Sequence, residues 1–94
     1  MNGLPYWAYV LWSESCHRFY IGISEDPEAR LREHNAGISK WTKNKGLWII
    51  VWRRQCPSLG EARKLENYLK RQKGGAGFYK LTDLTIDSFH SSGS

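Results

Sequence analysis

The sequence is poor in cysteine and has no long apolar run, and each shortage excludes a class of protein. Its two cysteines, Cys16 and Cys56, do not have the spacing of zinc ligands. We therefore expect two reduced thiols in a cytosolic protein rather than a disulfide. No apolar stretch reaches the roughly eighteen residues that a membrane span needs. The chain also opens without a basic segment followed by an apolar one, so we expect neither export nor a membrane partner.

Acidic residues are scarce in the middle of the chain. Residues 30–80 contain thirteen Lys and Arg but three Glu, whereas residues 1–29 contain one Arg and four acids. This concentration of positive charge, on a chain of net charge +5, favours a polyanion such as a nucleic acid as partner. The alternative is a basic surface that only keeps the protein soluble.

The 94 residues suffice for one domain, which we assign to residues 1–90, with a disordered tail at 91–94. Apolar runs and their breaks predict the order strand, strand, helix, strand, helix, over residues 6–12, 18–23, 27–35, 47–55 and 59–72. Residues 78–89 have enough apolar side chains for a short third helix or an extended segment. The order predicts a small α/β (α+β) fold, in which helices flank a three-stranded, largely antiparallel sheet.

Both predicted helices have recognisable start signals. Asp26 offers an N-cap oxygen and Pro27 occupies the first helical position, where its missing N–H costs nothing. That helix should end near Gly37. Ser58 and Glu61 have the spacing of a capping box at the start of the second helix.

Two packing expectations follow from the apolar residues. The apolar start of the strand at 47–55 indicates a central strand that is covered on both faces. Four apolar residues of the second helix form one stripe that should pack on the sheet: Leu59, Ala62, Leu65 and Leu69. Glu66 borders this stripe, at the edge of the buried face.

An ordered set of motifs resembles the opening signature of GIY-YIG nucleases. The set comprises Tyr9-Val10-Leu11, Tyr20-Ile21-Gly22, Arg30 and His34. The two tyrosines are eleven residues apart, Arg30 follows ten residues later, and His34 lies one helical turn beyond it, as in the family pattern. The first motif departs from the family, because Trp7-Ala8-Tyr9 replaces Gly-Ile-Tyr. The resemblance covers residues 6–80 and is strongest to small standalone bacterial members, which are similar to the incision domain of the excision-repair nuclease.

The resemblance implies five site residues: Tyr9, Tyr20, Arg30, His34 and Glu66. It makes Tyr9 the first choice for orienting or deprotonating the attacking water, with Tyr20 as partner, and we expect neighbouring cations to lower the tyrosine pKa. Arg30 would bind the phosphate bidentately, and His34 would polarise a tyrosine hydroxyl or bind phosphate. Glu66 aligns with the family's metal-binding glutamate, so Mg²⁺ or Mn²⁺ is the expected cofactor.

Each of these residues also has an ordinary structural interpretation. The tyrosines could be core aromatics of a hairpin, Arg30 a solvated helix residue, and His34 a residue that pairs with the helix dipole. Glu66 could simply pair with Lys70, four residues on.

A basic loop with an aromatic residue follows the first helix. Its predicted nucleic-acid contacts are Lys40, Trp41, Thr42, Lys43 and Lys45. Ammonium groups suit phosphates, and an indole can stack on an unpaired base. The alternative places Trp41 at the edge of the core. Ser24 and Thr42 are further candidate hydrogen-bond donors to phosphate.

The sequence therefore predicts a divalent-metal-dependent endonuclease that cuts DNA, with single-stranded or structured DNA as candidate substrates. A bacterial cytosolic role in DNA repair and a targeting protein partner are further expectations, since so small a domain has little surface for reading a long site. The alternative is a nucleic-acid-binding module without catalysis. An adaptor that binds proteins through its aromatic surface has the least support.

Overall fold

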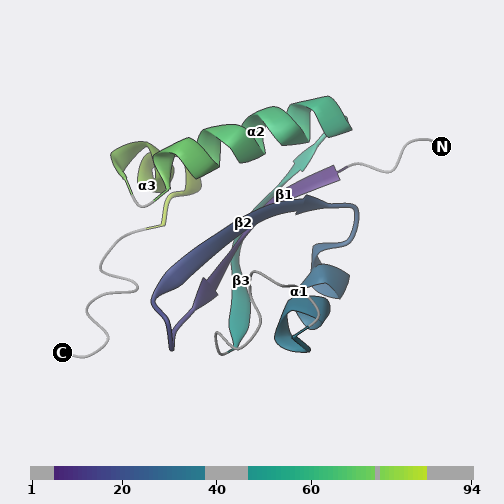
Figure 1. The fold of residues 1–94 in the computed structure, drawn as a ribbon. Coiled ribbons are helices and arrows are strands. Elements are labelled where there is room, and N and C mark those ends of the chain that lie inside the picture. The colour runs from purple at the N-terminus through teal and green to yellow at the C-terminus, as the bar shows by residue number, and fades with distance from the viewer. Residues whose placement is uncertain (1–5, 38–46, 74, 85–94) are drawn as a thin grey trace.

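The computed structural model describes residues 6–37, 47–73 and 75–84, and it confirms the predicted α+β fold (Figure 1). The elements in chain order are β1 (Tyr6–Ser13), β2 (Arg18–Ser24), α1 (Pro27–Asn35), β3 (Trp48–Cys56), α2 (Leu59–Gln72) and α3 (Ala76–Thr82). Residues 78–82 of the closing segment are thus helical; its residues 85–89, and the tail at 91–94, lie outside the described residues. Within the described ranges, no helix is long and apolar enough to span a membrane.

The sheet has the order β2-β1-β3, and both pairings are antiparallel. The expectation that the third strand is central was therefore wrong. The central strand is β1, where residues 8–11 are at most 1% exposed, whereas Ile49 of β3 is 54% exposed. Leu47, which was expected to begin the strand, precedes it and is exposed. Two apolar runs of similar length look alike in sequence, because only the pairing decides which of them lies in the middle.

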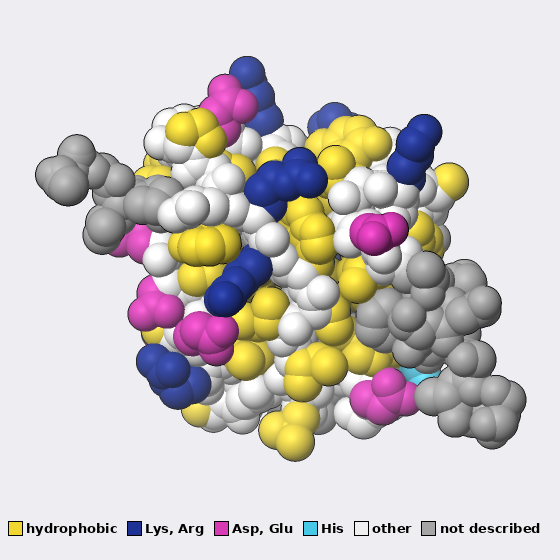
Figure 2. Space-filling view, turned by 180° about the vertical axis from the view of Figure 1, so that it is seen from behind, with side chains coloured by type: hydrophobic (Ala, Val, Ile, Leu, Met, Phe, Trp, Pro, Cys, Tyr) yellow, Lys and Arg dark blue, Asp and Glu magenta, His cyan; other side chains and the backbone are white. Residues whose placement is uncertain are grey.

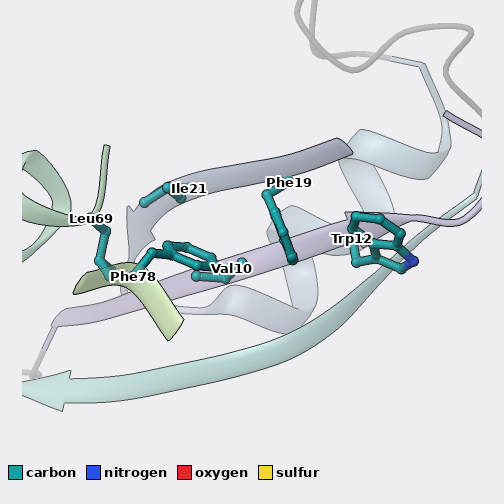
Figure 3. Packing of buried hydrophobic residues seen from close by; sticks show 6 residues of the cluster. All are labelled: Val10, Trp12, Phe19, Ile21, Leu69 and Phe78. Atoms are coloured by element: carbon teal, nitrogen blue, oxygen red, sulfur yellow. The ribbon is translucent and has the colours of Figure 1, made fainter. Parts of the chain in front are cut away.

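The sheet separates two hydrophobic clusters. Side chains that alternate along a strand point to opposite faces, and β1 sends Val10 and Trp12 one way and Tyr9 and Leu11 the other. The first cluster contains Val10, Trp12, Phe19, Ile21, Leu69 and Phe78, and it lies under α2 and α3 (Figure 3). On the other face, Leu31 of α1 packs against Tyr9, Leu11 and Trp48. The α1 face is the one that matters for the site.

Both helices begin where the sequence predicts. The side chain of Asp26 accepts a hydrogen bond from the backbone N–H of Ala29 at 3.1 Å, and Pro27 opens α1. The hydroxyl of Ser58 accepts a bond from the backbone N–H of Glu61 at 3.2 Å, which caps α2. Gly37 has a φ of 81°, the left-handed conformation that favours glycine after a helix.

Three of the four stripe residues on α2 pack as expected. Ala62 and Leu69 are fully buried, and Leu65 packs against the first cluster. Leu59 is 37% exposed, so its predicted packing on the sheet was wrong. Leu59 is the first residue of α2, and side chains lean toward the helix N-terminus, which directs this one away from the body of the helix.

Both cysteines are free thiols, as the sequence predicted. Cys56 is buried at the end of β3, and Cys16 is half-buried in the turn between β1 and β2.

We predict that Leu69→Ala lowers the free energy of unfolding by about 2–5 kcal/mol, because it leaves a cavity in a fully buried site. Leu59→Ala is the matched control on the same helix and should change stability by less than about 0.5 kcal/mol. Equilibrium unfolding in urea measures both. Equal losses would mean that Leu59 packs as tightly as Leu69 in solution.

Candidate active site

The candidate site is built around a close contact between a side chain of β1 and the backbone of the neighbouring strand β2. Tyr9 of β1 lies directly opposite Gly22 of β2 in the antiparallel register. A Cβ atom on residue 22 would lie 2.6 Å from the hydroxyl oxygen of Tyr9 and 2.8 Å from its Cζ. Only glycine therefore allows the phenol ring to lie across β2. Sequence reasoning missed this role of Gly22, although a glycine inside a strand often marks such an approach.

Three aromatic rings from three elements meet at this point. The Tyr9 hydroxyl oxygen lies 3.4 Å from Nε2 of His34 on α1, and both residues are 1% exposed. The ring of Tyr20 is 4.6 Å from that of His34 and 6.4 Å from that of Tyr9, measured between centroids. The structure therefore brings together both tyrosines and the histidine that the resemblance named. Tyr9 and His34 are also buried, so the interpretation of a tyrosine as a core aromatic holds for Tyr9.

Polar contacts at both ends of α1 hold it over the sheet. At its start, Glu28 pairs with Arg53 of β3 at 3.1 Å, and the Arg53 guanidinium lies over the ring of Trp7. At its end, the Asn35 side chain accepts a bond from the Trp48 backbone N–H at 2.7 Å and donates one to the Trp48 carbonyl at 3.0 Å. Sequence reasoning missed these contacts, because nothing in the local pattern identifies partners on a distant strand.

Arg30 lies one helical turn before His34, on the same side of α1. It forms a hydrogen bond with Tyr9, which contributes to the pKa shifts of both groups. It also forms an ion pair with Glu33, and its side chain is 40% exposed. The guanidinium thus has one side against the phenol and another open to solvent. Glu33 was not among the predicted site residues, because an acid three residues from an arginine is common on helices.

Burial keeps Tyr9 protonated. The pKa of Tyr9 is raised to about 12. Burial is the largest cause, the neighbouring Tyr20 contributes as well, and the Glu66 carboxylate adds a smaller part. The hydrogen bond and charge of Arg30 oppose the shift but do not overcome it. Our expectation that its neighbours lower the Tyr9 pKa was therefore wrong for the metal-free protein, because loss of hydration outweighs one nearby cation. At neutral pH Tyr9 is a phenol.

His34 is neutral for a related reason. Burial, and then the positive charge of Arg30, lower the pKa of His34 below its usual 6.5, while Glu33 raises it slightly. A neutral imidazole has one nitrogen with a proton and one without, so it can accept a proton. The site at neutral pH therefore combines a phenol, an acceptor imidazole and a permanent guanidinium.

Of the five residues that the resemblance named, Glu66 is the one that lies outside β1, β2 and α1. It lies on α2, its side chain is 14% exposed, and its carboxylate pairs with Lys70 at 3.1 Å. Burial and the neighbouring Tyr20 make larger contributions to the raised pKa of Tyr9, and the negative charge of Glu66 makes a smaller one. The carboxylate therefore lies within electrostatic range of the phenol. The predicted pairing of Glu66 with Lys70 is confirmed, and its role as a site residue stays a prediction.

Glu66 is the residue that could hold a metal here. Among the residues that the structure describes, no three His, Cys, Asp or Glu side chains form a metal-binding group. A single carboxylate oxygen donor suits a hard cation such as Mg²⁺, which keeps several waters, and does not suit zinc. The donor set therefore fits the expected Mg²⁺ or Mn²⁺.

The remaining predicted contacts with phosphate or nucleic acid are Ser24 and the residues of the basic loop. The Ser24 hydroxyl accepts a hydrogen bond from the backbone N–H of Asp26 at 2.9 Å, so it shapes the turn that leads into α1. The loop residues Lys40, Trp41, Thr42, Lys43 and Lys45 lie outside the described residues, and their nucleic-acid contacts stay predictions.

Comparisons with known proteins point to one family. Residues 5–78 match the family model of the GIY-YIG catalytic domain. The chain is 37% identical to the UPF0213 protein of Aeromonas salmonicida over 67 residues, which cover 70% of this chain and 49% of that protein. It is 29% identical over 97 residues to the structure-specific endonuclease subunit SLX1 homolog of Drosophila melanogaster, covering 77% of this chain and 33% of that protein.

The chain spans about half the length of the UPF0213 protein from Aeromonas salmonicida and a third of the SLX1 homolog that it matches. No solved structure gave a significant match.

We predict a specific loss of stability at high pH that depends on Tyr9. An unfolded tyrosine ionises near pH 10, whereas folded Tyr9 keeps its proton until about pH 12. Its contribution is therefore complete below pH 10 and is lost as the pH rises through the folded value. Between about pH 9 and about pH 11, wild type should lose about 1 kcal/mol more than Tyr9→Phe.

Urea unfolding of both proteins at the two pH values measures this difference. The other tyrosines are common to both proteins, so their ionisation cancels. Equal losses would show that the Tyr9 phenol is hydrated in the folded protein.

Proposed function

The chain belongs to the GIY-YIG catalytic domain family, and from this premise we propose that it is a divalent-metal-dependent endonuclease that hydrolyses DNA phosphodiester bonds. The observation that carries the proposal is the convergence of residues from β1, β2, α1 and α2 on one phenol: Tyr9, Tyr20, Arg30, His34 and Glu66. A similar protein, the SLX1 homolog, is named as a structure-specific endonuclease subunit, which supports the same activity.

Hydrolysis of a phosphodiester needs an attacking water, an acceptor for its proton and positive charge near the phosphorus. Arg30 supplies permanent positive charge and a planar set of donors that matches two phosphate oxygens. Its solvent-facing side, now paired with Glu33, is where the scissile phosphate would bind. The phosphate would take the place of the Glu33 carboxylate at the guanidinium.

Tyr9 and His34 together provide a path for the proton. Because Tyr9 is a phenol at neutral pH, it accepts the proton of the water while its own proton passes to Nε2 of His34, 3.4 Å away. The water oxygen forms the new bond to phosphorus as the bond to the leaving sugar oxygen breaks, and that oxygen takes a proton from solvent. Neutral His34 is essential to this scheme, since an imidazolium could not accept the proton.

Glu66 would hold the divalent cation, whose charge would stabilise the developing negative charge on the phosphate. Glu66 would exchange its ion pair with Lys70 for this ligand. The carboxylate lies within electrostatic range of Tyr9, and with a divalent cation bound its single negative charge would leave the site with net positive charge for the substrate.

Single-stranded or structured DNA is the substrate we propose. The described sheet face offers aromatic side chains and the guanidinium groups of Arg30 and Arg53 rather than an extended surface for reading bases, and Trp41 in the basic loop suits an unpaired base. A role in DNA repair in the bacterial cytosol, with a protein partner for targeting, completes the proposal. The name of the SLX1 homolog as a subunit supports a partner.

We predict that Glu66→Gln reduces cleavage roughly 100-fold or more, because the cation loses its protein ligand while the helix is unchanged. The assay uses labelled single-stranded, duplex, nicked, flap and branched DNA with magnesium or manganese. Glu61→Gln is the matched control, since Glu61 lies on the same helix but is exposed and pairs with Lys64.

Equal cutting by wild type and Glu66→Gln would remove Glu66 from the metal site. If wild type cuts none of these substrates but binds DNA with a steep dependence on salt, the protein is a binding module instead.

A further inference from the structure

We propose that the Arg53 guanidinium, which lies over the ring of Trp7, is the stacking surface for an unpaired base of the DNA strand that is cut. This inference rests on the proposed function, and it states how the site would recognise a single-stranded segment. We call Trp7, Glu28 and Arg53 the stacking site. Trp7 stands where the GIY-YIG motif has glycine, so the family signature does not account for this site.

Net positive charge alone does not locate a DNA path on this protein. Figure 2 shows Lys and Arg side chains spread over one face of the molecule, among acidic and apolar side chains, rather than gathered into one patch. A single strand offers a second feature, the flat faces of its unpaired bases, which stack on aromatic rings and on arginine guanidinium groups. The described residues include two arginines that lie over tryptophan rings, Arg53 over Trp7 and Arg54 over Trp52.

These two pairs lie on opposite faces of the sheet. Arg53 is directly opposite Tyr9 in the register between β3 and β1, and directly opposite residues point to the same face. Trp7 shares that face, because it lies two residues from Tyr9 on the same strand. Arg54 follows Arg53 and so points to the other face, where Trp52 packs against the first hydrophobic cluster. The Arg53 pair is therefore the one on the face of the candidate active site.

Contacts with two other elements hold the Arg53 guanidinium in place. Its Cζ lies 5.1 Å from the centroid of the Trp7 ring on β1, and its Nη1 pairs with the Glu28 carboxylate on α1 at 3.1 Å. The Arg53 side chain is nevertheless 43% exposed, so part of it can meet a ligand. A guanidinium that is held in place before binding loses little conformational freedom when a base stacks on it.

The surroundings of Arg53 suit a base better than a phosphate. A hollow of about 310 Å³ lies beside it, lined by Glu28, Ile50, Val51, Trp52 and Arg53. Apolar side chains favour the flat face of a base, and the Glu28 carboxylate can accept a hydrogen bond from a base N–H. The same carboxylate would repel a phosphate, and it already compensates the charge of Arg53.

The stacking site is close enough to the candidate active site to hold the same strand. Arg53 and Tyr9 are directly opposite each other, and such residues have Cβ atoms about 5 Å apart. Trp7 lies about 7 Å from Tyr9 along β1. Stacked bases are spaced about 3.4 Å apart, so these distances correspond to about one to two nucleotides. Because Arg30 forms a hydrogen bond with the Tyr9 phenol, a base near a phosphate at Arg30 would be within reach of Arg53.

The test is a DNA-binding measurement in the presence of a chelator, so that no metal-dependent cleavage occurs. The probes are a short labelled oligothymidylate and the same sugar–phosphate backbone without bases, each titrated over a range of salt concentrations. Arg53→Lys keeps the positive charge that pairs with Glu28 but removes the planar guanidinium. The matched control is Arg54→Lys, which makes the same change in the arginine–tryptophan pair on the other face of the sheet.

For Arg53→Lys we expect the affinity for the oligothymidylate to fall roughly fivefold or more, because one base loses its stacking surface. The affinity for the base-free backbone and the slope of log K against log salt should not change, since no phosphate contact is lost. Arg54→Lys should leave both affinities unchanged. Equal losses in the two variants, no loss for Arg53→Lys, or a loss that extends to the base-free backbone would overturn the proposal.

A cleavage assay separates this proposal from the proposed function. With magnesium or manganese, Arg53→Lys should raise the KM for single-stranded DNA, because the stacking site binds the strand without touching the reacting atoms. A wild type that cuts no DNA, combined with the expected loss of oligothymidylate binding, would refute the nuclease and leave the stacking site intact. Cleavage by wild type, combined with equal binding of the oligothymidylate by wild type and Arg53→Lys, would refute the stacking site alone.

Discussion

The Tyr9 ring lies across β2 at Gly22, and the rest of the candidate site depends on this close approach. On the α1 side of the sheet, the hydroxyl can lie over β2 because residue 22 has no Cβ atom; with one, the hydroxyl oxygen would be 2.6 Å from it. His34, Arg30 and Tyr20 then form the surroundings of that hydroxyl. A glycine in the middle of a strand costs some stability, and here it makes room for the Tyr9 ring.

The same burial that positions Tyr9 makes it a poor base. Its pKa of about 12 means that a phenolate is almost absent at neutral pH. The protein compensates with groups that are fixed in place: Arg30 against the phenol, His34 in a neutral state and Glu66 within electrostatic range. This arrangement explains why the site draws on four elements, since no single helix or hairpin could surround one hydroxyl in this way. The contacts of Glu28 and Asn35 with β3 then fix α1, which places two of those groups.

Local signals predicted local structure well. The N-cap oxygens of Asp26 and Ser58 identified both helix starts, and the spacing of Tyr9, Tyr20, Arg30 and His34 identified residues that the fold does bring together. The predictions that were wrong concern features that depend on contacts between residues far apart in the sequence. Strand order decides that β1 rather than β3 is central, and the sequence pattern does not contain it. The exposure of Leu59, the role of Gly22 and the raised pKa of Tyr9 likewise depend on how the elements pack.

A double-mutant cycle on DNA cleavage, with Gly22→Ala and Tyr9→Phe, tests most directly whether Gly22 acts by placing the Tyr9 hydroxyl. Gly22→Ala alone should reduce cleavage strongly, because the added methyl group displaces the hydroxyl from His34. If the two residues act as one unit, the double variant should be no slower than the slower single variant, so the free-energy effects should not add. If the two losses multiply, Gly22 and Tyr9 act independently, and the site is not organised around their contact.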